Sequence, residues 1–295
     1  MSNERIEDVA AVAGLRHWFQ LYVFGAESVW RTLVDRAERA GCEALVLTSN
    51  SQIFGNREWD SRTRASGRPS FSTILDSAAH PVWAARALVP RGMPVFANVI
   101  EFVPEKQRGF FSSAAWIRGQ MPQSLSWDTV HAIRKRWRGP FLLKGFLNPV
   151  DARIALDSGV DGIVVSSHGG RQMDWAVSPL DVLPRMRDVV GGRMQLVLAG
   201  GIRRGTDILK ATALGADAVM AGRAPLYGLC AGGAAGVERA LAILLKETRD
   251  AMGLLGVSRL DSVGADLVIP AMPRGGAPPA AIVRPVSLAR GERTT

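Results

Sequence analysis

The chain has 295 residues, of which 47% are hydrophobic, with 36 lysines and arginines against 27 aspartates and glutamates. This length and apolar content suit one large α/β domain or two smaller ones, and they exclude a chain that is disordered throughout. The net charge of +9 favours an anionic partner: a carboxylate or phosphate ligand, an acidic membrane surface or nucleic acid. No nucleic-acid-binding motif accompanies the charge, so a nucleic-acid partner is not expected.

The two cysteines and the start of the chain bear on its location. Cys42 and Cys230 lack the spacing of a metal site, which indicates a reduced compartment and ordinary packing of both thiols. The first residues, MSNERIEDVAAVAG, contain acids and lack a basic stretch followed by an apolar one, so a secretory signal is not expected. No stretch reaches the ~18 uninterrupted apolar residues of a membrane span. These patterns predict a cytoplasmic protein.

Strands and helices alternate along most of the chain. A strand at 17–24 and a helix at 26–40 follow a short helical lead-in. One junction then recurs at 37–49, 155–167 and 211–222: a helix, a glycine that permits a left-handed turn, a small residue, an acid and an apolar strand. The expected strands are 17–24, 43–49, 140–147, 160–167, 194–199 and 217–221, and the expected helices are 26–40, 126–137, 149–158, 178–190, 205–214 and 232–254.

This alternation predicts the fold class. Apolar strands between helices indicate a parallel sheet covered on both faces, and a (β/α)8 TIM-type barrel is its most economical closure. Six strands can be counted, two fewer than the barrel requires, so we expect an α/β barrel that is incomplete within this chain. Residues 1–268 are expected to form the barrel domain, and residues 269–295, rich in proline, glycine and arginine, an unstructured tail.

A long insertion interrupts the alternation at residues 56–125. Insertions of this length on the catalytic face of a barrel are typically lids, docking surfaces or disordered excursions. The stretch 81–103 is apolar, but Pro90, Gly92 and Pro94 divide it and exclude a spanning helix. Two interpretations stay open for it: a segment that lies on a membrane surface, and a lid packed against the barrel rim.

Residues 160–174, VDGIVVSSHGGRQMD, run from a buried strand into His168, two glycines and Arg171. Catalytic groups of parallel α/β folds lie at the carboxyl ends of strands, although a structural histidine followed by a glycine turn has the same pattern. Histidine suits a general base near neutral pH, and arginine suits bidentate capture of a carboxylate. Lys144 lies inside the apolar strand 140–147, where a lysine is costly to bury unless an anion faces it. These residues predict a site for an organic acid.

Two further strand ends suggest a phosphate site. Gly200 and Gly201 follow one strand and precede Arg203 and the start of a helix. Glycines allow close backbone approach, a helix N-terminus offers free N–H groups, and arginine adds a forked positive charge. Gly222 and Arg223 close the next strand in the same way, and a phosphate site in the last two loops is typical of these barrels. The sequence therefore predicts a phosphorylated cofactor, whose identity these patterns leave open.

The motifs resemble the FMN-dependent α-hydroxy acid dehydrogenase and oxidase family, which includes glycolate oxidase, L-lactate dehydrogenase and (S)-mandelate dehydrogenase. The resemblance runs from about residue 5 to about 265 and is most specific in SSHGGRQMD at 166–174 together with GGIRRGTD at 200–207. The other matching segments are WFQLY at 18–22, LTSNSQIFGNREWD at 47–60, LLKG at 142–145 and GRAPLYGL at 222–229. HPVW at 80–83 and GMP at 92–94 are similar to the membrane-associated lactate and mandelate dehydrogenases.

The resemblance implies an FMN enzyme that oxidises a lactate- or mandelate-like L-2-hydroxy acid to the 2-oxo acid. Electrons would pass from the flavin to a quinone or another carrier rather than to oxygen. The resemblance also implies a homo-oligomer and a peripheral contact with the inner face of the cell membrane through residues 69–125. The alternative is a catalytically impaired or non-catalytic barrel that at most binds flavin.

Residue roles follow from the same resemblance. His168 would be the base, Arg171 would bind the substrate carboxylate with Arg57 as a second candidate, and Tyr22 would hydrogen-bond the substrate. Lys144 would stabilise the reduced flavin ring. The residues expected at the cofactor are Gln20, Tyr22, Thr48, Lys144, Ser166, Ala199, Gly200, Gly201, Ile202, Arg203, Gly222 and Arg223.

The chain departs from the family pattern in three places. Asn50 stands where the family usually has an aspartate partner for the histidine, so slower proton transfer is expected. Ala199 stands where the family has an aspartate at the cofactor. The family's chain also begins earlier and supplies the first two barrel strands and a substrate-binding tyrosine. We therefore expect that these strands come from elsewhere, that the start was placed too late, or that the product folds poorly.

Overall fold

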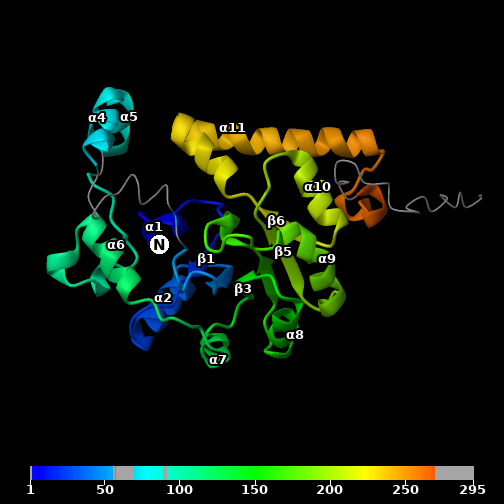
Figure 1. Ribbon diagram of the computed structural model, residues 1–295, viewed down its shortest axis with the longest axis horizontal. Helices are drawn as coiled ribbons and strands as arrows, with labels where there is room; N and C mark the ends of the chain where they lie inside the picture. Colours follow the sequence, from blue (N-terminus) through cyan, green and yellow to red (C-terminus); the bar gives the residue numbers. More distant parts are fainter. Residues whose placement is uncertain (1, 56, 58–69, 89–91, 270–295) are drawn as a thin grey trace, which may run out of the picture.

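The computed structural model describes residues 2–55, 57, 70–88 and 92–269. Its centre is a six-stranded parallel sheet in which the strands follow one another in chain order (Figure 1). All six expected strands are confirmed, each inside its expected range. They are β1 (Trp18–Leu21), β2 (Ala44–Thr48), β3 (Phe141–Phe146), β4 (Gly162–Val165), β5 (Gln195–Ala199) and β6 (Ala218–Met220).

The helices that follow the strands form an arc around the sheet (Figure 1). Ser126, Asn148 and Ser178 accept hydrogen bonds from the first turns of three of them, which explains where these helices begin. The described helices are α1 (Ile6–Ala10), α2 (Glu27–Arg39), α4 (Phe71–Ala79), α5 (Pro81–Leu88), α6 (Phe110–Gly119), α7 (Trp127–Arg136), α8 (Pro149–Asp157), α9 (Pro179–Val190), α10 (Gly205–Ala213) and α11 (Arg223–Leu255), with short 3-10 turns at Ile100–Phe102, Glu105–Gln107, His168–Gly170, Leu260–Ser262 and Ala265–Leu267.

The expected start of the last helix, at residue 232, coincides with a break in the helical backbone. Helix α11 begins at Arg223, directly after β6, and kinks at Gly232 and Gly233, where φ is −150° and 61°. The glycine pair is not helical and therefore marks the predicted boundary, while the helical turns that precede it from Arg223 were not expected. By length and composition alone α11 could cross a membrane: an 18-residue window has a mean hydropathy of 1.4, and 6% of that window is buried.

The core lies mainly between the sheet and the helices. Side chains alternate across a strand, so Leu45, Leu47, Phe141, Leu143 and their neighbours face the helices in the largest buried cluster. The alternate residues form a smaller buried cluster on the inner face of the sheet: Ala44, Val46, Leu142, Val164, Val197 and Ala199. The strands are therefore apolar on both faces, as their sequences predicted, and they hold the loops at their carboxyl ends in fixed positions.

The sheet is a half-barrel with two open edges. Within the described residues β1 pairs with β2 alone, and β6 pairs with β5 alone. The end strands are correspondingly less covered: Trp18 on β1 is 45% exposed, and no residue of β6 is fully buried. The expected incomplete barrel with six of its eight strands is confirmed.

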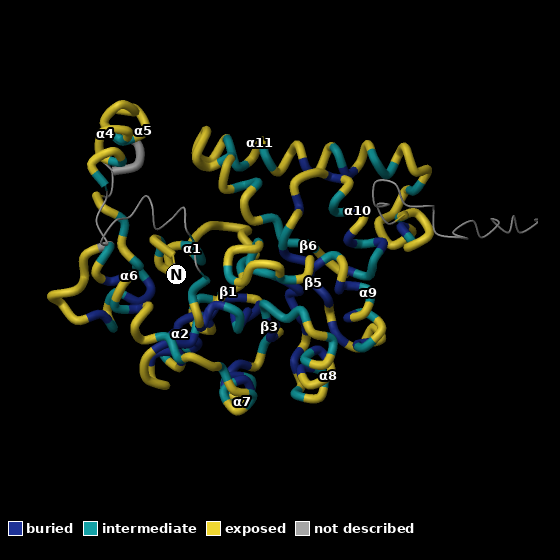
Figure 2. The backbone as a smooth tube through the Cα atoms, in the orientation of Figure 1, coloured by how far each residue is buried: buried dark blue, intermediate teal, exposed yellow. Residues whose placement is uncertain are grey.

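The described part of the insertion contains both exposed and buried segments. Helices α4 and α5 project from the body and expose Phe71, Ile74, Leu75, Val82 and Trp83 (Figures 1 and 2). The segment 96–103 instead packs into the main core, where the side chains at 99 and 103 are buried. The surface interpretation therefore fits α5, and the packed interpretation fits 96–103. The tail expected to be unstructured begins at 269, and 270–295 lie outside the described residues.

A buried arginine ties the start of the chain to the insertion. Arg36 on α2 is 8% exposed and donates to both carboxylate oxygens of Glu7 at 2.8 and 2.9 Å. It also donates to the backbone oxygen of Asn98 at 2.9 Å and to Glu101 at 3.0 Å. The hydrogen bond from Arg36 is the main cause that lowers the pKa of Glu7 to about 2. Because this pKa is depressed, the stabilisation is present above the ordinary value of 4.5 and is lost as pH falls toward 2.

Replacing Arg36 by alanine should lower the free energy of unfolding by about 3 kcal/mol, since it removes one partner of a largely buried polar network. Arg31→Ala is the matched control on the same helix, because its 2.6 Å pair with Glu27 is exposed and should contribute about 0.5 kcal/mol or less. Urea unfolding followed by circular dichroism measures both. Equal effects of the two substitutions would show that the Arg36 network does not stabilise the fold.

Candidate active site

The predicted site residues gather where the strands of the sheet have their carboxyl ends. Parallel strands place their carboxyl ends together, so loops far apart in sequence meet there. Gln20 lies on β1 and Tyr22 directly follows this strand, and Arg57 belongs to the loop after β2. The others lie on or directly after the remaining strands: Thr48 on β2, Lys144 on β3, Ser166, His168 and Arg171 after β4, Ala199, Gly200, Gly201, Ile202 and Arg203 at the end of β5, and Gly222 and Arg223 after β6.

His168 occupies an unusual backbone conformation. Its φ is 56°, in the left-handed region, and Gly169 and Gly170 follow with φ of 69° and 72°. The His168 N–H donates to the Ser166 hydroxyl at 3.1 Å, which helps to hold this turn. A non-glycine residue in this region costs about 1–3 kcal/mol and is frequent at functional sites. With this turn, the imidazole reaches two side chains of the loop after β2, Asn50 and Ser51.

The imidazole of His168 has defined partners. Its Nδ1 lies 3.1 Å from the Asn50 side-chain oxygen and 3.1 Å from the Ser51 hydroxyl. Asn50 Nδ2 donates to the Ser166 carbonyl at 3.2 Å, so the amide oxygen is the atom that faces the ring. Because that oxygen can only accept, the proton is on Nδ1 and the lone pair of the neutral ring is on Nε2. Nε2 is therefore the atom able to take a proton.

The charges around His168 are positive. Burial is the main cause that lowers its pKa to about 4, and the charges of Lys144, Arg57 and Arg171 lower it further. Asn50 supplies no negative charge to oppose them. The ring is thus neutral at physiological pH and ready to act as a base, but the imidazolium formed on proton uptake would be poorly stabilised.

Two glycines make room for this arrangement. Gly145 has φ 107°, and a Cβ there would overlap the Asn50 side chain. Gly55 packs so closely on the backbone of Gln172 that a Cβ would overlap its carbonyl group. At Gly145 the close neighbour is the Asn50 side chain, and at Gly55 it is backbone, so a larger residue at either position would displace the groups that hold His168.

Sequence reasoning missed the connecting role of Gln172. Its Nε2 donates to the carbonyls of Asn50 and Ile53 at 2.9 and 3.0 Å, and its Oε1 accepts from Arg57 at 2.7 Å. Arg57 also donates to the Arg171 carbonyl at 3.2 Å. Gln172 therefore joins the β2 and β4 loops. The motif SSHGGRQ contained it, and its position beside Arg171 was the available signal.

The β1 side of the site is a polar cluster. Gln20 Nε2 donates to Thr48 Oγ1 at 2.6 Å and to the Tyr22 hydroxyl at 3.0 Å. Burial raises the pKa of Tyr22, while Thr48, Arg57 and Ser51 act in the opposite direction. Tyr22 thus keeps its proton near neutral pH and can donate it in a hydrogen bond.

Lys144 is a half-buried cation on the inner face of the half-barrel. Burial lowers its pKa. Across the described ranges no carboxylate lies within salt-bridge distance of its ammonium group. An anionic group held against Lys144 would remove this electrostatic cost.

A cavity of about 310 Å³ lies at the carboxyl ends of β4 and β5 and is bordered by Gly200, Gly201, Ile202 and Asp207, and by Arg223 from the segment after β6. Arg223 also donates to the Gly169 carbonyl at 3.1 Å, which places its charge between this cavity and the His168 turn. Open backbone and a guanidinium suit a phosphate.

The expectation of free N–H groups at the start of α10 is wrong. The N–H groups of Arg203 and Arg204 donate to the Asp207 carboxylate at 3.0 and 2.9 Å, and that of Gly205 donates to Glu247 at 2.9 Å. Asp207 is the third residue of the helix and reaches back to cap it. A phosphate here would therefore depend on the glycine backbone and the arginine side chains.

Comparisons with known proteins identify the family. The model of the FMN-dependent dehydrogenase family matches residues 1–270. The chain belongs to this family. L-lactate dehydrogenase of Acinetobacter baumannii (strain AYE) is 36% identical over 271 residues, which cover 92% of this chain and 70% of the relative. L-lactate dehydrogenase of Ectopseudomonas mendocina (strain ymp) is 37% identical over 265 residues, which cover 90% of this chain and 70% of the relative.

Solved structures of the family have the same fold. The monotopic membrane protein (S)-mandelate dehydrogenase matches with a TM-score of 0.82 and 36% identity, over 90% of this chain and 69% of that one. Mandelate oxidase with (S)-2-phenylpropionate matches with a TM-score of 0.67 and 36% identity, over 89% of this chain and 65% of that one. The predicted family and its cofactor, FMN, are confirmed. The positive charge of Lys144, which has no carboxylate partner among the described residues, fits the flavin ring of that cofactor. The cavity beside Arg223 fits its phosphate.

Proposed function

We propose that the protein oxidises a lactate- or mandelate-like L-2-hydroxy acid to the 2-oxo acid with FMN. The observation that carries this proposal is the geometry of His168: a neutral imidazole with its proton fixed on Nδ1, surrounded by Lys144, Arg57 and Arg171. A base among cations suits an anionic substrate that must lose a proton. Relatives named lactate and mandelate dehydrogenases support the same substrate class.

The residues of this chain would bind the substrate and transfer its proton in the following way. Arg171 would hold the substrate carboxylate, with Arg57 supporting it through Gln172, and Tyr22 would donate a hydrogen bond to the substrate. His168 Nε2 would take the proton of the 2-hydroxyl group, while Asn50 and Ser51 keep the ring oriented. FMN, when bound, accepts the two electrons and the hydrogen that leave the substrate carbon.

The remaining residues of the proposed site would hold the cofactor. Lys144 would balance negative charge on the flavin ring, and Gln20, Thr48 and Ser166 would contact the ring or its ribityl chain. The phosphate would lie in the cavity lined by Gly200, Gly201, Ile202 and Arg223, with Arg203 and Gly222 nearby. Ala199 offers only its backbone there, since its side chain lacks a polar group.

Steady-state turnover tests the proposal. The FMN-loaded chain should reduce an artificial dye acceptor with L-lactate or L-mandelate, give little hydrogen peroxide in air, and show no turnover with the D-enantiomers. Turnover with neither enantiomer in a protein that holds FMN would overturn the substrate assignment. Fast reduction of oxygen would overturn the assignment of a quinone-like carrier as acceptor.

We infer a peripheral membrane contact through α4 and α5, since the acceptor would be a membrane-borne carrier. The two helices project from the body and expose Phe71 and Trp83 at 75% and 50%, as Figure 2 shows for their backbone. An exposed apolar surface of this kind is typical of a membrane-lying segment. A homo-oligomer and a location on the cytoplasmic face stay predictions.

Val82→Asp should reduce co-sedimentation with anionic lipid vesicles by about fivefold or more, because it places a charge in the apolar contact. Val150→Asp on α8 is the matched control, since the two valines are 65% and 64% exposed and receive the same charge. Equal losses for both variants would point to a general charge effect and not to α4 and α5.

A second candidate function is favoured by the open edges of the sheet. Half-exposed end strands, with Trp18 45% exposed, leave one side of the site uncovered and could yield a barrel that binds FMN without turnover. Tight FMN binding without reduction by any 2-hydroxy acid would favour this candidate over the enzyme.

A further inference from the structure

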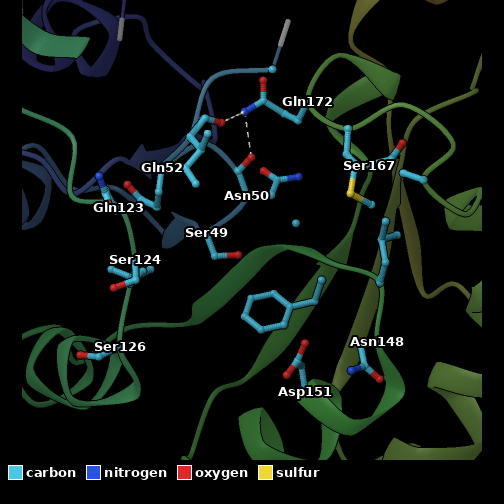
Figure 3. Close-up of a pocket in the computed structure, with 18 of the residues that line it drawn as sticks. Ser49, Asn50, Gln52, Gln123, Ser124, Ser126, Asn148, Asp151, Ser167 and Gln172 are labelled. Carbon is cyan, nitrogen blue, oxygen red and sulfur yellow. Dashed lines mark hydrogen bonds between the residues drawn. The ribbon is translucent and has the colours of Figure 1, made fainter. Parts of the chain in front are cut away.

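The side-chain amide of Gln172 joins the two loops of the proposed site through three hydrogen bonds. Its Nε2 donates to the backbone carbonyls of Asn50 and Ile53 at 2.9 and 3.0 Å, and its Oε1 accepts from Arg57 at 2.7 Å. Figure 3 shows this amide beside Asn50, with dashed hydrogen bonds from its nitrogen. Gln172 comes from the loop after β4, whereas all three partners belong to the loop after β2.

The partners of this amide determine its orientation. The two carbonyl oxygens can only accept hydrogen bonds, and the Arg57 guanidinium can only donate them. The reverse orientation of Gln172 would place its oxygen against two other oxygens and its NH₂ group against a donor. An ionised glutamate at this position would keep the acceptor for Arg57 but could not donate. The position therefore requires two donors and one acceptor, which the glutamine amide supplies.

Asn50 is held by the β4 segment at both its backbone and its side chain. Its backbone carbonyl accepts from Gln172, and its side-chain Nδ2 donates to the Ser166 carbonyl at 3.2 Å. The first bond fixes the backbone from which the side chain projects, and the second fixes how the amide is turned. The Asn50 side-chain oxygen then lies 3.1 Å from Nδ1 of His168. The acceptor that faces the imidazole is therefore placed by both bonds.

The place of this acceptor decides the tautomer of the base. A neutral imidazole carries its proton on Nδ1 or on Nε2, and the hydrogen bonds at the ring select between the two. The proposed reaction requires the proton on Nδ1, since Nε2 must be free to accept one. Ser51 also lies 3.1 Å from Nδ1 of His168, but its hydroxyl can donate or accept and so selects neither tautomer. The selection therefore depends on Asn50, whose oxygen can only accept.

We propose that Gln172 is a positioning residue: by donating to the Asn50 carbonyl, it holds the Asn50 side chain where that side chain keeps the proton of His168 on Nδ1. The second donated bond, to Ile53, closes the same turn of the β2 loop, and the bond from Arg57 fixes the Gln172 amide in the orientation that donates. This inference rests on the proposed function, because the tautomer matters for turnover only if His168 is the base.

The tautomer of His168 can be measured without any turnover. In the FMN-loaded chain with ¹⁵N-labelled histidine, two-bond ¹⁵N–¹H spectra above neutral pH distinguish a proton on Nδ1 from one on Nε2, and His168→Asn identifies the signal. Gln172→Met, of similar length, removes the donors and the acceptor, whereas Gln172→Glu keeps the acceptor alone. Both should raise the ratio of the Nε2–H to the Nδ1–H form by about 3- to 10-fold, the effect of one net hydrogen bond. An unchanged ratio in either variant would overturn the proposal.

Matched substitutions of another glutamine provide the control. Gln107 is exposed on a 3-10 turn, so Gln107→Met and Gln107→Glu should leave the tautomer ratio of His168 unchanged. Circular dichroism melting confirms that each variant is folded. A ratio that changes as much in the Gln107 variants as in the Gln172 variants would also overturn the proposal, because the effect would then not depend on the bonds of Gln172.

A double-mutant cycle tests whether Gln172 acts through Asn50. Gln172→Met should lower kcat with L-lactate or L-mandelate by about tenfold, since a misplaced base loses much of its effect. In an Asn50→Ala background the same substitution should change kcat by less than about twofold, because the group that it positions is already absent. Losses that multiply would overturn the proposal. If the tautomer ratio changes as expected but the unmodified chain oxidises no 2-hydroxy acid, the proposed function fails and the hold of Gln172 on the His168 tautomer stands.

Discussion

His168→Asn is expected to lower turnover of the L-2-hydroxy acid by about 10³-fold, because a positioned general base contributes on the order of 10²–10⁴. Asparagine tolerates the left-handed backbone that His168 adopts at φ 56°, so the loop should keep its shape. FMN binding should change little, since the proposed phosphate and ring contacts remain. Dye-linked turnover and the flavin absorbance of the purified variant measure the two effects.

His131→Asn provides the control for this substitution. His131 is exposed on α7, away from the carboxyl edge of the sheet, and its replacement should leave turnover within about twofold of the unmodified chain. Retention of more than about a tenth of the turnover by His168→Asn would exclude His168 as the base.

Asn50→Asp is expected to raise turnover by about tenfold or more above neutral pH, because it gives the imidazolium a charged partner. The pKa of His168 is lowered to about 4, mainly by burial, and kcat/KM should therefore fall only below about pH 4 in the unmodified chain. A carboxylate placed 3.1 Å from Nδ1 should raise that pKa and shift the acid limb upward by about two pH units.

The pH dependence of kcat/KM for the two proteins checks this result. Asn148→Asp is the control, since it makes the same change in a residue that caps α8 and has no contact with the imidazole among the described residues. A profile and a turnover that Asn50→Asp leaves unchanged would show that Asn50 does not limit proton transfer.

The fold was largely predictable from local patterns. Six apolar strands and the glycine-acid junctions predicted the parallel sheet, because the helix-capping glycines and the strand starts depend on neighbours in sequence. The helix predicted to start at residue 232 does follow a break at Gly232 and Gly233, but the helical turns between Arg223 and this break were not predicted. The burial of residues 96–103 could not be predicted from the sequence either, because it depends on contacts with helices that are distant along the chain.

The candidate site was predictable in its residues but not in its connections. His168, Arg171 and Lys144 could be proposed because each is a costly or chemically suited residue at a strand end. Ser51 and Gln172 were missed, since their hydrogen bonds to distant loops define them rather than their side-chain type. The capping of α10 by Asp207 and Glu247 was missed for the same reason, because Glu247 lies on α11.

Anaerobic titration of the FMN-loaded chain tests the central claim most directly. L-lactate or L-mandelate should bleach the visible flavin band of the unmodified chain, and the D-enantiomers should not. His168→Asn, loaded with FMN to the same extent, should bleach about 10³-fold more slowly. A chain that holds FMN but keeps its full flavin absorbance with every 2-hydroxy acid would contradict the account, and so would equally fast bleaching of His168→Asn.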